Sequence, residues 1–227
     1  MVSWAAERRA VVLVCRRLYD RGLIAGQDGN VSVRVAEDVV LVTPAGLSKI
    51  DLRPSDLVDL STDGVHLAGG RAASSEVAVH LRIYRRRPDV GAVVHAHPPT
   101  ATAFTVAREP LVATALPEVM LQMGDVATVP YATPGTEALA DAFEPFVAAH
   151  DAFLMANHGA TTVGPTLTVA HQRMESLEHA ARIMFQAQRL GRVTTLTDDQ
   201  LRDLTAARDA ARSRDAQQTP RWARRTE

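Results

Sequence analysis

Two periodicities of apolar and polar residues divide the first third of the chain into predicted elements. Over residues 3–21 the apolar positions recur every three or four residues, which predicts an amphipathic helix that ends at Gly22. Further along, apolar residues alternate with polar ones in short runs separated by turn residues such as Ser-Thr-Asp-Gly, which predicts strands. These predicted strands are 31–35, 39–42, 58–60 and 65–67, and one helical turn is predicted at 54–57.

The remaining two thirds alternate between helical periods and short apolar runs. The predicted helices are 75–87, 99–107, 134–150, 166–190 and 198–212, and Pro145 is expected to interrupt the third of them. The predicted strands are 89–95, 126–130 and 151–157. Because strands and helices alternate without the strict spacing of βαβ units, we expect one α/β domain over residues 1–212 with a mixed sheet. Residues 213–227 are polar and are expected to form a mobile tail.

Composition and charge narrow the classes of function. The 227 residues are 46% hydrophobic and 22% charged, which is ordinary for a globular domain. A formal net charge of −1 argues against a broad nucleic-acid-binding face and against a polybasic membrane anchor. No apolar run is long enough to span a bilayer, and charges interrupt the apolar N-terminal segment, so no signal peptide is predicted. The single cysteine, Cys15, is expected to be a buried hydrophobe, and the expected compartment is the cytoplasm.

The basic residues are divided unevenly between arginine and lysine. Of the 25 basic residues only Lys49 is a lysine, so any mechanism that needs a lysine Schiff base must use it. Codon bias is the simplest explanation of the excess of arginine. Lys49 lies in a segment that looks polar, so we expect its side chain to be exposed and protonated at neutral pH.

A pair of histidines gives the clearest chemical signal. His95 and His97 stand at the end of a predicted strand, where side chains two residues apart point the same way and can reach one cation. His158 ends another apolar run and adds a third imidazole. Three imidazoles with an open fourth position are typical of a catalytic Zn²⁺ site. The alternative is three histidines with purely structural roles at the ends of strands.

Glu76 is predicted to lie beside these histidines. A helix and a strand joined by a tight turn run antiparallel, so the end of the 89–95 strand returns to the start of the 75–87 helix, where Glu76 lies. There Glu76 could be a metal ligand or a general base, or only a partner of the helix dipole. Ser74 and Ser75 could donate to a phosphate at this helix start, or could simply cap the helix.

Six short motifs, in this order and spacing, resemble the class II aldolase/adducin family over roughly residues 5–195. They are GLIAGQDGNVSVR, LVTPAG, ASSE, VVHAHP, VPYATPGTEAL and MANHG. The resemblance implies a three-layer αβα fold around a mainly antiparallel sheet. It also implies a homotetramer with active sites between neighbouring subunits.

Residue by residue, the resemblance also implies a site. His95, His97 and His158 match the zinc ligands of the family. Glu76 matches the acidic residue that holds resting zinc and then moves a proton at the substrate carbon. The residues that match the binding site for the substrate phosphate are Asn30, Gly46, Ser74 and Ser75.

The activity implied by the resemblance is that of a lyase. It is a metal-dependent aldolase that cleaves a ketose phosphate to dihydroxyacetone phosphate and an aldehyde through a metal-stabilised enediolate. The same site would serve a sugar-phosphate 4-epimerase, dehydratase or decarboxylase, and a non-enzymatic adducin-like interaction domain is a further alternative. A divalent metal other than Zn²⁺ would serve as well. Neither nucleic acid nor a membrane is an expected partner.

Two departures from the family pattern concern side chains that would contact the substrate. Ala45 stands where the family's TPSG motif usually has a hydroxyl residue, so one donor to phosphate is missing. The tyrosines that the family's aldolases use as acids have no match, and Glu118 is a loosely placed candidate for this role. Tyr131 is expected to be structural.

Overall fold

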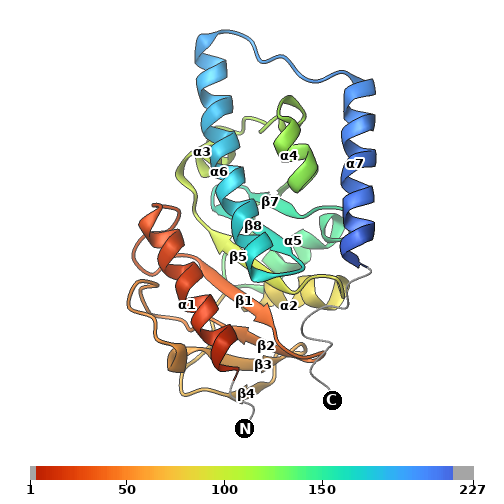
Figure 1. Ribbon diagram of the computed structural model, residues 1–227. Helices are drawn as coiled ribbons and strands as arrows, with labels where there is room; N and C mark the ends of the chain where they lie inside the picture. The colour runs from red at the N-terminus through yellow and green to blue at the C-terminus, as the bar shows by residue number, and fades with distance from the viewer. Residues whose placement is uncertain (1–3, 217–227) are drawn as a thin grey trace.

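An eight-stranded sheet forms the centre of the computed structural model, which describes residues 4–216 (Figure 1). The strand order is β4-β3-β2-β1-β5-β8-β7-β6, and every neighbouring pair is antiparallel except β6 and β7. The mainly antiparallel mixed sheet is therefore confirmed. The strands are β1 (Asn30–Arg34), β2 (Val39–Val42), β3 (Val58–Ser61), β4 (His66–Ala68), β5 (Ala92–Ala96), β6 (Val126–Val129), β7 (Ala152–Met155) and β8 (Gly159–Gly164).

Helices cover both faces of the sheet and complete the three layers. One apolar core lies between the sheet and α1, α3 and α6, and a second lies between the sheet and α2 and α5. The helices α4 and α7 pack against each other beside α6 (Figure 1). The helices are α1 (Ala5–Asp20), α2 (Val77–Arg86), α3 (Pro99–Ala107), α4 (Pro117–Gln122), α5 (Glu137–Val147), α6 (Leu167–Leu190) and α7 (Asp198–Ala216), with short 3₁₀ turns at Pro54–Asp56 and Ala113–Ala115.

The central strand β5 is buried on both faces, and its alternation positions the candidate site. Ala92, Val94 and Ala96 belong to the core under α1, α3 and α6, whereas Val93 belongs to the core under α2 and α5. Because side chains alternate along a strand, His95 points to the same face as Val93. His95 therefore lies on the face of the sheet that α2 covers.

The predicted amphipathic character of the first helix is present in α1. In α1 the side chains of Val11, Cys15 and Leu18 are buried, while Arg9 and Arg16 are exposed, as the amphipathic pattern predicts.

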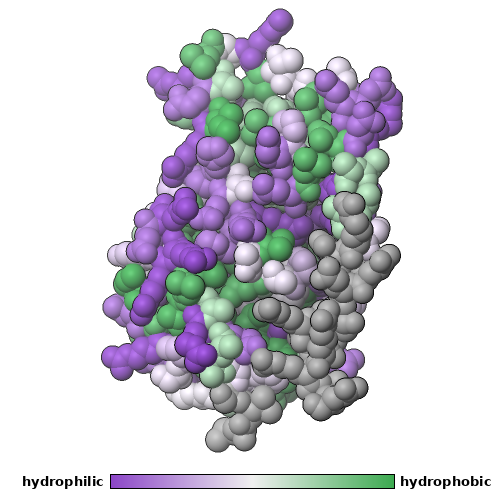
Figure 2. All heavy atoms as spheres, viewed as in Figure 1, coloured by the Kyte–Doolittle hydropathy of each residue, from purple (hydrophilic) through white to green (hydrophobic). Residues whose placement is uncertain are grey.

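On the face drawn in Figure 2, hydrophobic side chains occur in small separate groups among hydrophilic ones. Within residues 4–216, none of the helices combines the length and the apolar character needed to cross a membrane.

The strand β8 was not predicted from the sequence, because glycines stand at both of its ends. A Cβ atom added at Gly159 would lie 2.6 Å from the carbonyl oxygen of Ala96, and one added at Gly164 would lie 2.8 Å from the backbone nitrogen of Ala170. These glycines permit close packing of neighbouring backbone and do not mark turns. The short helix α4 was also missed.

Two predicted boundaries differ from the structure. Pro145 does not interrupt α5, which runs unbroken from Glu137 to Val147. Since Pro145 stands in the last turn of the helix, its missing N–H removes one hydrogen bond only, and the exposed ring meets little resistance. The helix α7 continues to Ala216, beyond the predicted end at residue 212. The rest of the predicted tail, 217–227, lies outside the described residues.

Candidate active site

Three histidines from two neighbouring parts of the sheet face one another. His95 lies in β5, His97 follows that strand, and His158 lies in the tight turn between β7 and β8. Because β5 pairs with β8, with His95 opposite Thr161, the turn that holds His158 is brought to the end of β5. The three ring centroids stand 4.9–5.1 Å apart, and one ring nitrogen from each histidine lies within 4.8 Å of the other two.

The hydrogen bonds of His95 fix which of its nitrogens faces the other rings. Its Nδ1 donates to the carbonyl oxygen of Ala160 at 2.9 Å, so Nε2 is the nitrogen that faces the other rings. That Nε2 lies 3.2 Å from Nε2 of His97. Burial, together with the neighbouring His95 and His158, lowers the pKa of His97 to about 4, so His97 is neutral at pH 7. Imidazole binds a metal in its neutral form, through the ring nitrogen that carries no proton.

Glu76 closes the group of histidines from the side of α2. Its Oε2 lies 3.1 Å from Nε2 of His95, and its Oε1 lies 3.1 Å from Nε2 of His158. Asn30 on β1 donates from Nδ2 to Oε2 of Glu76 at 3.0 Å. Burial raises the pKa of the Glu76 carboxyl, but the hydrogen bonds from His158 and His95 outweigh it and hold the pKa well below its usual range. The carboxylate therefore faces the histidines as an anion, and it is not engaged in capping the helix.

The residues predicted to bind phosphate lie beside this group. They line a cavity of about 320 Å³ together with Glu76, His97 and His158. Ser74 is buried and lines the cavity, and its Oγ accepts a hydrogen bond from the backbone N–H of Glu76, the residue before α2. The residues from the sequence prediction that line the cavity are Asn30, Gly46, Ser74, Ser75, Glu76, His97 and His158.

Lys49 also lines this cavity, and the prediction that it is exposed is wrong. Its side chain is 3% exposed, and Nζ donates to the carbonyl oxygens of Gln27 at 2.8 Å and Leu47 at 3.0 Å. Burial lowers the pKa of Lys49. The sequence contained a signal that was overlooked, since Leu47, Ile50 and Leu52 place apolar residues on either side of the lysine. Leu52 is fully buried, so this segment folds inward.

The other candidate residues lie away from the cavity lining. Three further histidines lie in helices and do not line the cavity: His80 and His171 are buried, and His179 is exposed. Glu118 is exposed on α4 and is not among the cavity residues. Tyr131 is 64% exposed and does not line this cavity.

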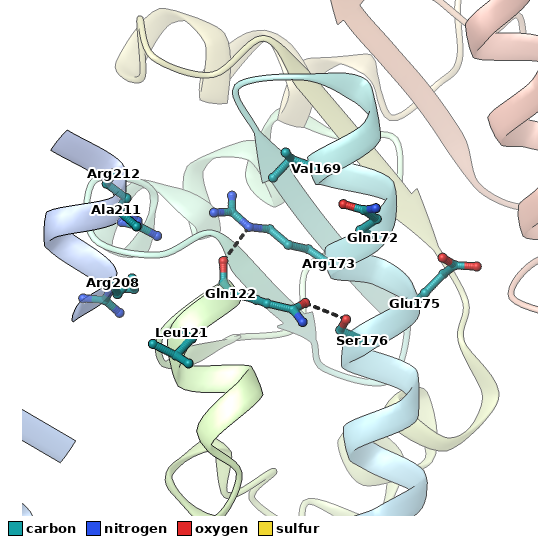
Figure 3. Close-up of a pocket in the computed structure, with 10 residues that line it drawn as sticks. All are labelled: Leu121, Gln122, Val169, Gln172, Arg173, Glu175, Ser176, Arg208, Ala211 and Arg212. Atoms are coloured by element: carbon teal, nitrogen blue, oxygen red, sulfur yellow. Dashed lines mark hydrogen bonds between the residues drawn. The ribbon is translucent and has the colours of Figure 1, made fainter. Parts of the chain in front are cut away.

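A larger cavity of about 540 Å³ lies between α4, α6 and α7 and holds none of the predicted site residues (Figure 3). Arg173 donates there from Nε to the carbonyl oxygen of Gln122, and the side chain of Gln122 bonds to Ser176. Arg173 and Arg212 both contact the buried carboxylate of Asp151. The polar groups of this cavity thus bind mainly one another, and they join α7 to the rest of the fold.

Comparison with known proteins gives a consistent set of similarities. The family described as "Class II Aldolase and Adducin N-terminal domain" matches residues 9–185. The 3-oxo-tetronate 4-phosphate decarboxylase of Haemophilus influenzae is 33% identical over 207 residues, which cover 88% of this chain and 96% of that protein. The 5-deoxy-D-ribulose 1-phosphate aldolase of Bacillus thuringiensis is 34% identical over 200 residues, which cover 87% of this chain and 93% of that protein. A solved structure of an L-fuculose 1-phosphate aldolase gives a TM-score of 0.82 at 30% identity, over 88% of this chain and 94% of that chain.

Proposed function

The chain belongs to the class II aldolase and adducin family, and from this premise we propose that it is a metal-dependent lyase acting on a phosphorylated sugar. The observation that carries the proposal is the facing set of His95, His97, His158 and Glu76 beside a cavity lined by Ser74 and Ser75. A non-enzymatic interaction domain has no need of such a set.

The residues present fit a divalent metal. Three imidazoles, each with a ring nitrogen within 4.8 Å of the other two, and one carboxylate against them match the donor set that Zn²⁺ prefers. We propose that His95, His97 and His158 hold the metal, with Zn²⁺ as the first choice. The chemistry that such a metal supplies when bound is polarisation of a substrate carbonyl and stabilisation of the negative charge that develops as the neighbouring bond breaks.

Glu76 is placed to move the proton. Its carboxylate lies at the edge of the cavity and is oriented by the hydrogen bond from Asn30. A general base or acid must lie within hydrogen-bonding reach of the proton that it transfers. A substrate whose phosphate lies against Ser74 and Ser75 would occupy the cavity that Glu76 also lines.

The first candidate reaction is aldol cleavage of a ketose 1-phosphate. The bond between C3 and C4 breaks, the C4 hydroxyl loses its proton, and the C4 part leaves as an aldehyde. The electron pair of the broken C3–C4 bond stays with C3 and forms an enediolate. Glu76 returns a proton to C3 of this enediolate to give dihydroxyacetone phosphate. The reaction therefore needs proton transfer at two positions of the substrate.

Decarboxylation of a 3-oxo acid phosphate is the second candidate. One relative carries the name of a 3-oxo-tetronate 4-phosphate decarboxylase. Loss of CO₂ from such an acid leaves the same enediolate, and one proton at that carbon gives the same dihydroxyacetone phosphate. Because CO₂ leaves without any proton transfer, the reaction needs only the one proton that is added to the enediolate, and Glu76 alone can supply it. The absence of the family's acidic tyrosines from this sequence favours this candidate.

One experiment tests both candidates. The metal-loaded protein is incubated separately with a series of ketose 1-phosphates and with 3-oxo-tetronate 4-phosphate, and dihydroxyacetone phosphate is measured by a coupled NADH assay. Release of an aldehyde identifies an aldolase, and release of CO₂ identifies a decarboxylase. A chelator should abolish the activity, and Zn²⁺ or another divalent metal should restore it. A protein that binds no metal and forms no product from either class would contradict the proposal.

A further inference from the structure

We propose that Lys49 supplies the positive charge that binds the substrate phosphate and that it holds together the two loops around that phosphate. This inference rests on the proposed function and deepens it, because it concerns the same cavity. The family resemblance assigns no role to this residue. The proposal comes from the position of the single lysine in the structure.

Lys49 ties together two loops of the cavity. Its Nζ donates to the carbonyl oxygen of Gln27 on the loop before β1 and to that of Leu47 on the loop after β2. The first loop leads into Asn30, and the second contains Gly46, so each loop carries a proposed phosphate-binding residue. A loss of Lys49 would free both loops at once.

The charges around the cavity call for a cation. The lining residues include two carboxylates, Asp28 and Glu76, whereas the proposed phosphate donors are neutral hydroxyl, amide and backbone groups. Among the lining residues Lys49 is the only lysine or arginine. A phosphate dianion placed near two carboxylates is repelled unless a cation lies close to it. Because the Lys49 side chain is buried, its charge is screened less than that of a surface lysine.

An ammonium group suits the position of Lys49 better than a guanidinium group would. An ammonium group has three donors, and two of those of Lys49 are used by the Gln27 and Leu47 carbonyls. The third is available to the cavity, which Lys49 lines. This donor replaces the hydroxyl that is missing at Ala45. The amine donates to both carbonyl groups, so Lys49 is positioned as a hydrogen-bond donor and not as a nucleophile.

A substitution separates binding from chemistry. In Lys49→Met the side chain keeps most of its length and loses its charge. We expect KM for the phosphorylated substrate, and the inhibition constant of inorganic phosphate, to rise together by about 10- to 100-fold, and kcat to fall by a smaller factor. The matched control is Arg9→Met, which removes one positive charge from an exposed position on α1. Metal content, measured on each variant, should not change.

A second measurement needs no substitution. Lysine labelled with ¹³C at Cε gives one signal in the wild-type protein, because Lys49 is the only lysine. Addition of inorganic phosphate should move this signal saturably, with the same midpoint as phosphate inhibition, while chloride at equal ionic strength should not.

The outcomes of the two measurements separate the two proposals. If phosphate inhibits the wild type but the lysine signal stays in place and Lys49→Met is inhibited equally well, the role of Lys49 is wrong and the proposed function stands. If phosphate neither inhibits nor moves the signal, both the phosphate subsite and the role of Lys49 are refuted. If Lys49→Met does not fold, the labelled wild-type protein still decides the question.

Discussion

At the scale of single residues, the arrangement of imidazoles is the feature most in need of a partner. The Nε2 atoms of His95 and His97 lie 3.2 Å apart, and His158 places a ring nitrogen within 4.8 Å of a ring nitrogen of each. One cation can be bound by all three rings at such distances. Glu76 adds a negative charge from a third direction.

Removing any one of the three histidines should remove the metal. His95→Ala, His97→Ala and His158→Ala are each expected to lose most of the bound metal after dialysis, because two neutral ligands hold the ion far more weakly than three. Metal content is measured by elemental analysis against protein concentration. The control His179→Ala changes an exposed histidine and should keep its metal. A variant of the set with full metal and full activity would show that its histidine is not a ligand.

Replacing Glu76 by Gln should separate catalysis from metal binding. Glu76→Gln keeps the shape of the side chain but cannot take up a proton, so turnover should fall by about 100- to 10,000-fold. The three histidines are untouched, so most of the metal should remain. Steady-state rates and metal content are measured on the same preparation. A rate within a few-fold of wild type would exclude Glu76 as the proton-transfer group.

His80 should make the fold sensitive to acid. Its ring is 1% exposed and lies with Nδ1 2.7 Å from Oγ of Ser32, which also bonds to the hydroxyl of Tyr84. Burial, and then the nearby His95, lower the pKa of His80 to about 3, while Glu76 opposes this shift. An unfolded histidine has a pKa of about 6.5, so stability is complete above that pH and falls as the pH drops toward 3.

The size of this effect can be measured. At pH 5 the loss attributable to His80 is about 2 kcal/mol, from about 1.5 pH units at 1.36 kcal/mol each. Urea unfolding of chelator-treated protein at pH 7 and pH 5 should therefore show a smaller pH-dependent loss for His80→Gln than for wild type. The exposed His179→Gln serves as the control. Equal losses in His80→Gln and wild type would disprove the assignment.

At the scale of elements, the start of β8 is the point where the sheet and the site meet. A Cβ atom at Gly159 would lie 2.6 Å from the carbonyl oxygen of Ala96 and 2.7 Å from Cδ2 of His97. The side chain of His97 and the pairing of β5 with β8 therefore both depend on this glycine.

Gly159→Ala should disturb the site more than the fold. The overlap should cost about 1–3 kcal/mol of stability and push His97 out of line with the other two imidazoles. We expect weaker metal binding, measured by competition with a chromogenic chelator, and a circular dichroism spectrum close to that of wild type. The control is Gly70→Ala, where an added Cβ meets no atom within 4 Å. Unchanged metal affinity in Gly159→Ala would contradict this account.

The elements that the sequence predicts well are those in which one periodicity dominates. The helix α2 and the strand β5 have clear patterns, and their antiparallel return is enough to bring Glu76 to His95. The strand β8 could not be predicted in this way, because its glycines serve contacts with residues far away in the sequence. The burial of Lys49 could not be predicted for a related reason, since it depends on carbonyl groups of two loops that come together only in the fold.

At the scale of the whole molecule, the proposed ligands come from separate parts of the chain. Glu76 stands at the start of α2, His95 and His97 at the end of β5, and His158 in the turn between β7 and β8. An unfolded chain cannot bring these groups together, so a metal at this site binds the folded state alone.

Chelation should therefore lower the melting temperature. A metal present at 100 times its dissociation constant stabilises the folded state by about 2.7 kcal/mol. For a chain of this length the shift is about 5–10 °C. Differential scanning fluorimetry with and without a chelator measures it, and His158→Ala should be insensitive to the chelator. A wild-type melting temperature that does not depend on metal would argue against a metal shared by these elements.

The burial of the single lysine also determines how the protein can be handled. Its surface carries guanidinium groups but no accessible ε-amino group, because the one lysine is 3% exposed. Reagents that acylate amines, such as succinimidyl esters, would be left with the α-amino group of each chain. Amine crosslinking could then join chains only through their α-amino groups, so it would report poorly on the assembly in solution. The tetramer expected from the family resemblance should accordingly be sought by sedimentation or native mass spectrometry, and dyes or solid supports should be coupled through an introduced cysteine.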